Sequence, residues 1–143
     1  MTRAMLDALE AKFPDKELTL ICDSYFDVPF GENAYDAAVS VESLHHFTAE
    51  QKESLYTRLH AVLKENSCFV LTDYFADSEE QEKELFRNLK QLKQEQGLPE
   101  DVFFHYDTPL TVEHESAALR KAGFSEIRIM KNWGHTFTLL AVR

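Results

Sequence analysis

The chain has 143 residues, enough for one hydrophobic core, and its hydrophobic content of 44% is ordinary for a globular domain. Its formal net charge of −10 at pH 7 argues against a nucleic-acid backbone or an anionic membrane as its main partner. The sequence has neither an apolar run of about 18 residues nor the apolar core of a signal peptide, which predicts a cytoplasmic protein without a membrane span.

The first third of the chain predicts a helix, a strand, a loop and a second strand. Apolar residues at helical spacing predict a helix over residues 1–13, ended by Pro14. The short apolar run LTLIC, residues 18–22, predicts a buried strand. Residues 27–34 contain Pro, Gly and Asn and predict a loop. A second buried strand is expected at residues 35–41, YDAAVSV.

Two helices in the middle of the chain begin with capping signatures. Thr48 is followed three residues later by Gln51, and Ser78 is followed in the same way by Gln81. This spacing is typical of a capping box, in which the two side chains satisfy backbone amides at the start of a helix. A third strand is expected between these helices, at residues 67–75.

The end of the chain predicts one more helix and a β-hairpin. The helix runs from Thr111 to Gly123, and two strands at 124–133 and 135–142 meet at Gly134. So tight a connection leaves only an antiparallel pair. Helices alternating with the earlier strands indicate an α/β fold with a mostly parallel sheet, ending in an antiparallel hairpin.

The two cysteines, Cys22 and Cys68, both lie in apolar runs. They lack the spacing of a CxxC pair. We expect reduced thiols, buried on strands, rather than a disulfide or a nucleophile.

Four segments carry a family resemblance. They are ICDSYFDVPF, YDAAVSVESLHHF, LHAVLKENSCFVLTDYF and LTVEHESAALRKAGFSEIRI. In this order and spacing they resemble the third, fourth and fifth strands, and the helix before the terminal hairpin, of class I (Rossmann-like) S-adenosylmethionine (SAM)-dependent methyltransferases. The triplet Glu65-Asn66-Ser67 stands where that family usually has a Pro-Gly-Gly turn.

The resemblance implies a set of cofactor-binding residues. Asp23 matches the acid that contacts the adenine of SAM, with Ser24 and Tyr25 beside the base. Ser40 and Val41 end the strand that faces the sulfonium. For Asp23 the alternative is an ordinary acid at a strand end beside a turn.

Candidate substrate-binding residues follow the expected strands. Glu42 could orient a substrate amine, or it could be solvated. Tyr74 could stack on or hydrogen-bond an acceptor, or pack as an ordinary aromatic residue. The segment 77–109 is longer than a crossover needs, and it is interpreted either as a substrate lid, with Phe104 and Tyr106 as an apolar wall, or as an auxiliary helix covering the sheet.

His45 and His46 raise the question of a base or a metal ligand. Methyl transfer from SAM is a direct displacement, so a base is needed only when the acceptor must lose a proton. His46 and Tyr74 are the candidate catalytic residues. Adjacent histidines usually point in different directions, so we expect no metal, with one ring near the cofactor and the other at the surface.

One family feature is absent from this sequence. The family binds the amino-acid part of SAM with a glycine-rich loop, and none of the four glycines, Gly31, Gly97, Gly123 and Gly134, forms one. We therefore expect a single incomplete domain over residues 1–143 that lacks the first two strands and binds SAM weakly or not at all. The open sheet edges should be covered by a homodimer, by a missing N-terminal segment, or by direct pairing of residues 18–22 with 35–41.

Two functions follow from these observations. The first is SAM-dependent methyl transfer, in an intact enzyme, to an unidentified acceptor that the aromatic lid favours as a small molecule. The alternative is a non-catalytic, truncated relative that acts through self-association. Another Rossmann-like enzyme is disfavoured because the sequence has neither a G-x-S-x-G elbow nor a G-x-G-x-x-G loop.

Overall fold

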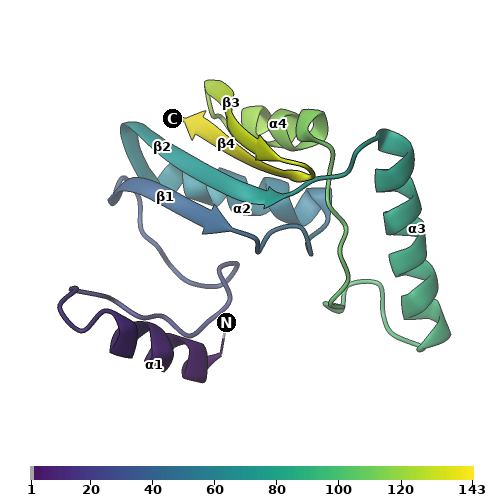
Figure 1. The fold of residues 1–143 in the computed structure, drawn as a ribbon, viewed down its shortest axis with the longest axis horizontal. Coiled ribbons are helices and arrows are strands. Elements are labelled where there is room, and N and C mark those ends of the chain that lie inside the picture. Colours follow the sequence, from purple (N-terminus) through teal and green to yellow (C-terminus); the bar gives the residue numbers. More distant parts are fainter. Residues whose placement is uncertain (1) are drawn as a thin grey trace. The chain divides into compact units, whose positions relative to one another are not determined.

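The computed structural model describes residues 2–143, which fall into two compact units divided between Phe30 and Gly31. The elements in chain order are α1 (Arg3–Lys12), β1 (Tyr35–Val41), α2 (Ala49–Val62), β2 (Leu63–Tyr74), α3 (Glu79–Glu95), α4 (Val112–Lys121), β3 (Glu126–Trp133) and β4 (Thr136–Val142) (Figure 1). Among the described helices, none is long and apolar enough to cross a membrane.

The first unit contains α1 and an irregular segment. The predicted helix is confirmed over Arg3–Lys12, while Met1 lies outside the described residues. Residues 18–22, expected to be a buried strand, form no strand, and that prediction is wrong. A strand is stable only when its backbone pairs with a neighbour, and these residues are largely exposed instead. Cys22 is accordingly exposed and not on a strand, which corrects the expectation of a buried thiol.

The second unit is built on a four-stranded sheet with the order β1-β2-β4-β3. The predicted α/β fold and its terminal hairpin, β3–β4, are confirmed. Among the described strands β1 and β2 form the one parallel pair, while β2–β4 and β3–β4 are antiparallel. The sheet is therefore mixed, and the expected excess of parallel pairs is not present in these four strands.

Helices α2 and α4 lie on the same face of this sheet (Figure 1). The alternation of side chains along a strand explains which residues they cover. Phe69, Leu71 and Asp73 of β2 are buried, whereas Val70 and Thr72 between them are half-buried. The core under the two helices is completed by apolar side chains of α2, α4 and β4, namely Leu55, Tyr56, Val62, Ala118, Leu119, Leu139 and Ala141.

A backbone irregularity separates the start of β2 from its main run. Tyr35 is paired with Leu63, but Ala37 is already paired with Cys68, so β2 carries extra residues here. Asn66 lies in this segment with φ of 61°, a left-handed conformation that glycine and asparagine tolerate best. Asn66 thus supplies a left-handed backbone at the point where the pairing of β2 with β1 is irregular.

Both predicted helix starts are present, with different detail. Thr48 and Gln51 form a complete capping box at α2. At α3 the Ser78 hydroxyl accepts from the Gln81 amide at 3.2 Å, but the Gln81 side chain accepts from the amide of Asp77 rather than that of Ser78. The capping pattern therefore identifies both helix starts. At α3 the Gln81 side chain accepts from the amide one residue before the N-cap Ser78.

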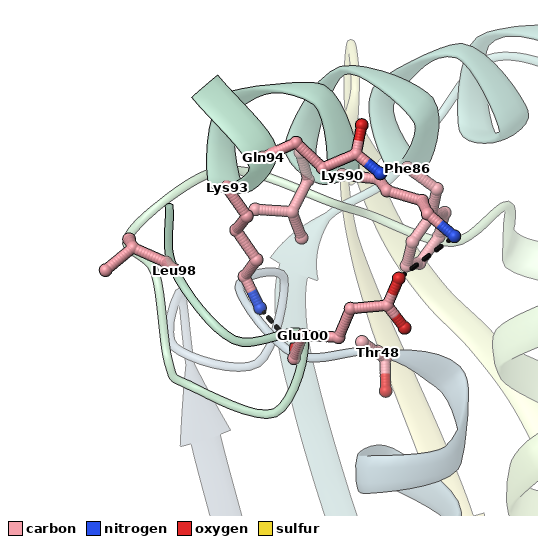
Figure 2. Close-up of a pocket in the computed structure, with 8 residues that line it drawn as sticks. Thr48, Phe86, Lys90, Lys93, Gln94, Leu98 and Glu100 are labelled. Atoms are coloured by element: carbon pink, nitrogen blue, oxygen red, sulfur yellow. Dashed lines mark hydrogen bonds and ion pairs between the residues drawn. The ribbon is translucent and has the colours of Figure 1, made fainter. Parts of the chain in front are cut away.

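Helix α3 and the loop after it make up most of the segment 77–109. A cavity of about 180 Å³ lies between α3, the loop and Thr48 (Figure 2). Two of its lysines are already engaged by Glu100: Lys90 pairs with the carboxylate at 3.0 Å, and Lys93 donates to the carbonyl oxygen at 2.7 Å. The first turn of α3 is tied to the start of α4, because the buried Glu82 carboxylate accepts from the Thr111 amide at 2.7 Å and contacts His114 Nδ1 at 2.8 Å.

Candidate active site

The carboxyl ends of β1 and β2 meet at one edge of the sheet. Because the two strands are parallel and Val41 is paired with Thr72, the residues that follow each strand lie side by side. This edge is where open α/β sheets bind ligands. Glu42, directly after β1, has a left-handed φ of 44°, and its amide donates to the Thr72 carbonyl at 2.8 Å. The turn directs the chain of residues 43–46 across the end of β2.

A buried carboxylate organises this turn. Asp73 has 2% exposure, and its Oδ2 accepts from the Leu44 amide at 2.8 Å. Its Oδ1 accepts from the Tyr74 amide at 2.9 Å and lies 2.5 Å from Nδ1 of His45. The carboxylate thus holds both the backbone of the turn and the orientation of the His45 ring. With Nδ1 donating to Asp73, the neutral ring carries its lone pair on Nε2.

The pKa values of the pair move apart. The hydrogen bond to Asp73 raises the pKa of His45, and it outweighs the opposing effect of burial. Burial would raise the pKa of Asp73, but the hydrogen bonds from His45, the Leu44 amide and the Tyr74 amide together lower it. Asp73 is therefore ionised at neutral pH and stabilises a proton on His45.

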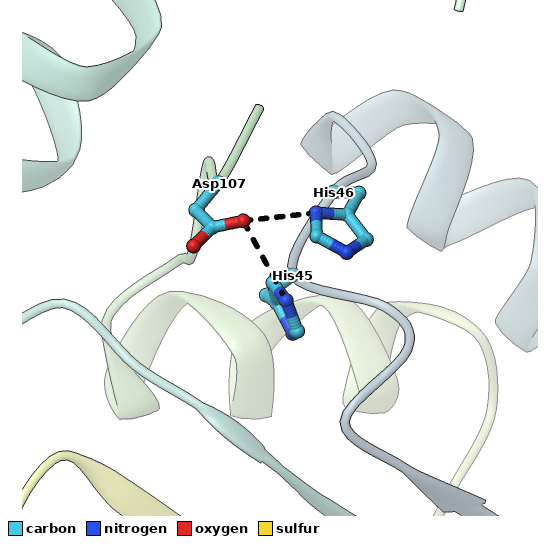
Figure 3. A group of neighbouring side chains, drawn as sticks. All are labelled: His45, His46 and Asp107. Atoms are coloured by element: carbon cyan, nitrogen blue, oxygen red, sulfur yellow. Dashed lines mark ion pairs between the residues drawn. The ribbon is translucent and has the colours of Figure 1, made fainter. Parts of the chain in front are cut away.

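His46 lies beside His45 rather than facing away from it. The ring centroids of His45 and His46 are 4.0 Å apart, and the ring centroid of His105 lies 4.3 Å from that of His46. Both His45 and His46 face the carboxylate of Asp107: His46 Nδ1 is 3.0 Å and His45 Nε2 is 3.7 Å from Asp107 Oδ1 (Figure 3). Burial lowers the pKa of His46, and the neighbouring His45 and His105 lower it further.

Thr108 holds the Asp107 segment against this turn. Its amide donates to the His45 carbonyl at 2.7 Å, and its hydroxyl lies 3.4 Å from the same oxygen. Thr108 is fully buried, so this contact is shielded from water. Asp107 therefore comes from the loop after α3, but its backbone position is fixed from the His45 turn.

A second buried ionic group lies next to the site. The Lys52 ammonium of α2 is 2.6 Å from the Glu115 carboxylate of α4, which also accepts from the Tyr56 hydroxyl. The positive charge of Lys52 slightly opposes protonation of His45, because it lowers the pKa of that ring. This group ties the two covering helices together behind the site.

The predicted site residues fall into two groups. Asp23, Ser24 and Tyr25 belong to the first unit, where the Asp23 carboxylate accepts from the Ser24 amide at 2.8 Å. The other residues belong to the second unit. Ser40 is half-buried with its hydroxyl 3.3 Å from that of Ser43, and Val41 is exposed.

The candidate substrate residues are distributed around the His45 turn. Glu42 is exposed, and Tyr74 is half-buried with its ring edge-on to His45 at 6.4 Å. Phe104 and Tyr106 are half-buried in the loop that carries Asp107. Tyr74 and His46 thus lie next to the site.

Sequence reasoning missed the partnership of His45 with Asp73 and the presence of Asp107. The first had a signal, because a histidine after one strand and an acid at the end of the adjacent parallel strand must meet at the same edge. Nothing in the sequence indicates the role of Asp107, because it lies 62 positions from His45 and approaches it through the fold.

The residues that the resemblance assigns to SAM lie in two separate units, Asp23 in the first and the end of β1 in the second. The amino-acid part of SAM needs closely approaching main-chain amides, and none of the four glycines lies in a loop that provides them. The fit is therefore partial.

Comparison with known proteins gives one family match. Residues 1–66 match a family model described as a methyltransferase domain. A curated relative, 24-methylenesterol C-methyltransferase 3 from Arabidopsis thaliana, is 28% identical over 81 residues. That alignment covers 53% of this chain and 22% of the plant protein.

Solved methyltransferase structures share the fold. Human N-acetylserotonin methyltransferase in complex with SAM has a TM-score of 0.59 and 20% identity, over 85% of this chain and 32% of that one. The Burkholderia thailandensis 1,6-didemethyltoxoflavin-N1-methyltransferase, with bound 1,6-didemethyltoxoflavin and S-adenosylhomocysteine, has a TM-score of 0.66 and 14% identity, over 100% of this chain and 58% of that one. The chain therefore spans less than two thirds of the length of each relative, and it has the class I methyltransferase fold.

Proposed function

We propose that this methyltransferase-like domain of the class I fold takes part in methyl transfer from SAM to a small-molecule acceptor, with His45 as the base. The pairing of His45 with the buried Asp73 carries the proposal. The pair stands at the sheet edge where α/β folds bind ligands. The methyltransferase relatives support SAM as the methyl donor.

SAM supplies an activated methyl group, and the residues of this chain handle the acceptor. An acceptor hydroxyl or amine at the β1–β2 edge gives its proton to His45 Nε2 and takes the methyl group, while the sulfur keeps the electron pair of the broken bond. Asp73 holds the ring in the tautomer that leaves Nε2 able to accept and stabilises the resulting positive charge. Tyr74, edge-on to His45, borders the same space.

His45 suits the role of base better than His46. An ionised carboxylate stabilises a proton on His45, whereas burial and two neighbouring imidazoles disfavour a proton on His46. His46 was the candidate drawn from the sequence, and on this geometry its role is to pack against His45 and contact Asp107.

The test measures cofactor binding and turnover separately. It uses the chain alone and the whole product of its gene wherever that is longer. We expect the chain alone to bind SAM only weakly in calorimetry, because its sequence lacks the glycine-rich loop. In a whole product that binds SAM, Asp23→Asn should weaken affinity by roughly 5- to 30-fold, the scale of one charge-assisted hydrogen bond.

The catalytic part of the test uses labelled SAM with a panel of small phenols, carboxylic acids and amines. His45→Ala should lower kcat by about 100-fold or more without changing SAM affinity, which is the scale of general base catalysis. The matched control is His135→Ala, since His135 forms a similar but exposed contact with Asp77 at 2.6 Å. An unchanged kcat in His45→Ala, or no SAM binding by the whole product, would contradict the proposal.

Self-association is a second candidate, favoured by the edge strand β1. Among the described strands β1 is paired with β2 alone, and its Val39 and Val41 side chains are 69% and 60% exposed. An apolar strand with an open edge tends to pair with another strand. We expect a homodimer unless a further segment of the same protein covers this edge. Light scattering that gives the 16.6 kDa chain mass at every concentration would exclude the dimer.

A further inference from the structure

We infer that His45, His46 and Asp107 form a binding site for a divalent transition-metal cation, with Zn²⁺ as the best match. Each residue offers one ligand atom, and the three atoms lie within 4.8 Å of one another. Two imidazoles and one carboxylate are a ligand set that zinc uses with three protein ligands, the fourth position being left for water or substrate.

The spacing of the ligand atoms agrees with tetrahedral coordination. Bonds of 2.0–2.1 Å from a central zinc ion place tetrahedral ligand atoms about 3.3 Å apart. Asp107 Oδ1 lies 3.0 Å from His46 Nδ1 and 3.7 Å from His45 Nε2. These two distances lie on either side of that value, and all three ligand atoms lie within 4.8 Å of one another, so a cation would draw the three side chains together (Figure 3).

The bond between His45 and Asp73 prepares the first ligand. Metal-binding histidines usually donate their other ring N–H to a carboxylate, which fixes the ring and increases its basicity. Asp73 holds His45 Nδ1 in this way, while Nε2 faces Asp107. Asp73 is buried and accepts from the Leu44 and Tyr74 amides, so its carboxylate is already held in place before any cation binds.

The second ligand is His46, whose ring nitrogen Nδ1 lies close to Asp107. Among the described residues, the buried His46 Nδ1 has no hydrogen-bond partner, although Asp107 Oδ1 lies 3.0 Å away. A buried polar atom without a partner costs free energy. A cation bridging the carboxylate and this nitrogen would satisfy both groups. Asp107 is also held in range by the contact of Thr108 with the His45 backbone.

From the sequence, the two adjacent histidines were expected to point in different directions and to bind no metal together. In the structure the turn after β1 brings their rings to 4.0 Å from each other. A bound cation would occupy the His45 lone pair, so added Zn²⁺ should slow methyl transfer in the whole protein. This last consequence alone rests on the proposed function.

The test titrates the untagged chain, without SAM, with Co²⁺ and with Zn²⁺ at pH 7.5 in a non-chelating buffer. The background carries Cys22→Ser and Cys68→Ser, which removes thiol ligands. We expect one site per chain, the intense visible absorption of four- or five-coordinate cobalt, and its displacement by Zn²⁺. Because SAM is absent, failure here and failure of the methyl-transfer proposal are distinguishable.

Four variants assign the site. His46→Ala and Asp107→Ala should each weaken Zn²⁺ binding by about tenfold or more, and Asp73→Asn by about 10- to 100-fold through His45. His135→Ala, which removes an exposed histidine–carboxylate contact, should leave affinity unchanged. Circular dichroism checks that each variant is folded, and Asp107→Ala, at an exposed side chain, is the variant that keeps the core intact. Two results would overturn the site. One is a Zn²⁺ affinity in His46→Ala and Asp107→Ala equal to that of the chain without these substitutions. The other is a cobalt spectrum no stronger than that of hydrated Co²⁺.

Discussion

The buried contact between Lys52 and Glu115 gives the sharpest test of how the covering helices are held together. Their side chains are 2% and 1% exposed, and Lys52 Nζ lies 2.6 Å from Glu115 Oε2. Lys52→Met keeps most of the apolar volume but removes the ammonium. Glu115 is then left buried with the Tyr56 hydroxyl as its remaining side-chain donor among the contacts described here.

The expected cost follows from the burial of both charges. Removing one partner of a buried ion pair destabilises a protein by about 3–5 kcal/mol, because the other charge remains uncompensated. An exposed pair would contribute only about 0–1 kcal/mol. At about 1.4 kcal/mol per factor of ten, Lys52→Met should lower the folding equilibrium constant by roughly 100-fold or more.

Urea unfolding followed by circular dichroism measures this difference, with the slope of the transition checked for constancy. The matched control is the triple variant Lys52→Met, Tyr56→Phe and Glu115→Leu, which replaces the whole polar group with apolar side chains. We expect the triple variant to recover most of the stability, since buried pairs are often replaceable by well-packed apolar residues. A cost below about 1 kcal/mol for Lys52→Met would refute the reasoning, because the pair would then behave as if exposed.

Three further predictions concern other parts of the second unit. Asn66→Ala should cost about 1 kcal/mol relative to Asn66→Gly in urea unfolding, because φ at this position is 61°; equal stabilities would contradict a left-handed backbone there. Burial is the main reason why the pKa of His60 is lowered in the folded chain, so the unfolded chain takes up this proton first. The free energy of unfolding therefore falls as the pH drops from the ordinary histidine pKa to the lower pKa of the folded state. His60→Gln should therefore flatten the loss of stability between about pH 7 and 5, and an unchanged pH slope would count against it. Glu82→Ala should speed hydrogen exchange at the Thr111 amide by about tenfold or more, since that amide loses its buried acceptor, and unaltered exchange would show that α3 is held in another way.

Local rules account for the parts of the fold that the sequence predicted correctly. The capping box of Thr48 and Gln51 involves two side chains and two amides within four residues, so it can be read without tertiary information. The same holds for the hairpin around Gly134, whose tight connection leaves only an antiparallel pair. These elements carry their own hydrogen-bond partners nearby in the chain.

The failures concern elements whose partners lie far away. Residues 18–22 have a composition suited to a buried strand, but composition cannot supply the neighbouring backbone that a strand requires. The candidate site is similar. His45 and His46 stood out as residue types, but their roles depend on Asp73 and Asp107, which approach from β2 and from the loop after α3.

The two outer strands of the sheet differ in their capacity to be extended. At β3 the register shifts between Ile129 and Lys131, and a bulge of this kind twists an edge away from regular pairing. Charged side chains at Arg128 and Lys131 add a further obstacle to pairing there. Among the described strands, β1 is therefore the edge better suited to pair with an incoming strand, and a single open edge can pair once. Growth by strand addition would then stop at a closed pair, because a fibre needs two open edges in each molecule.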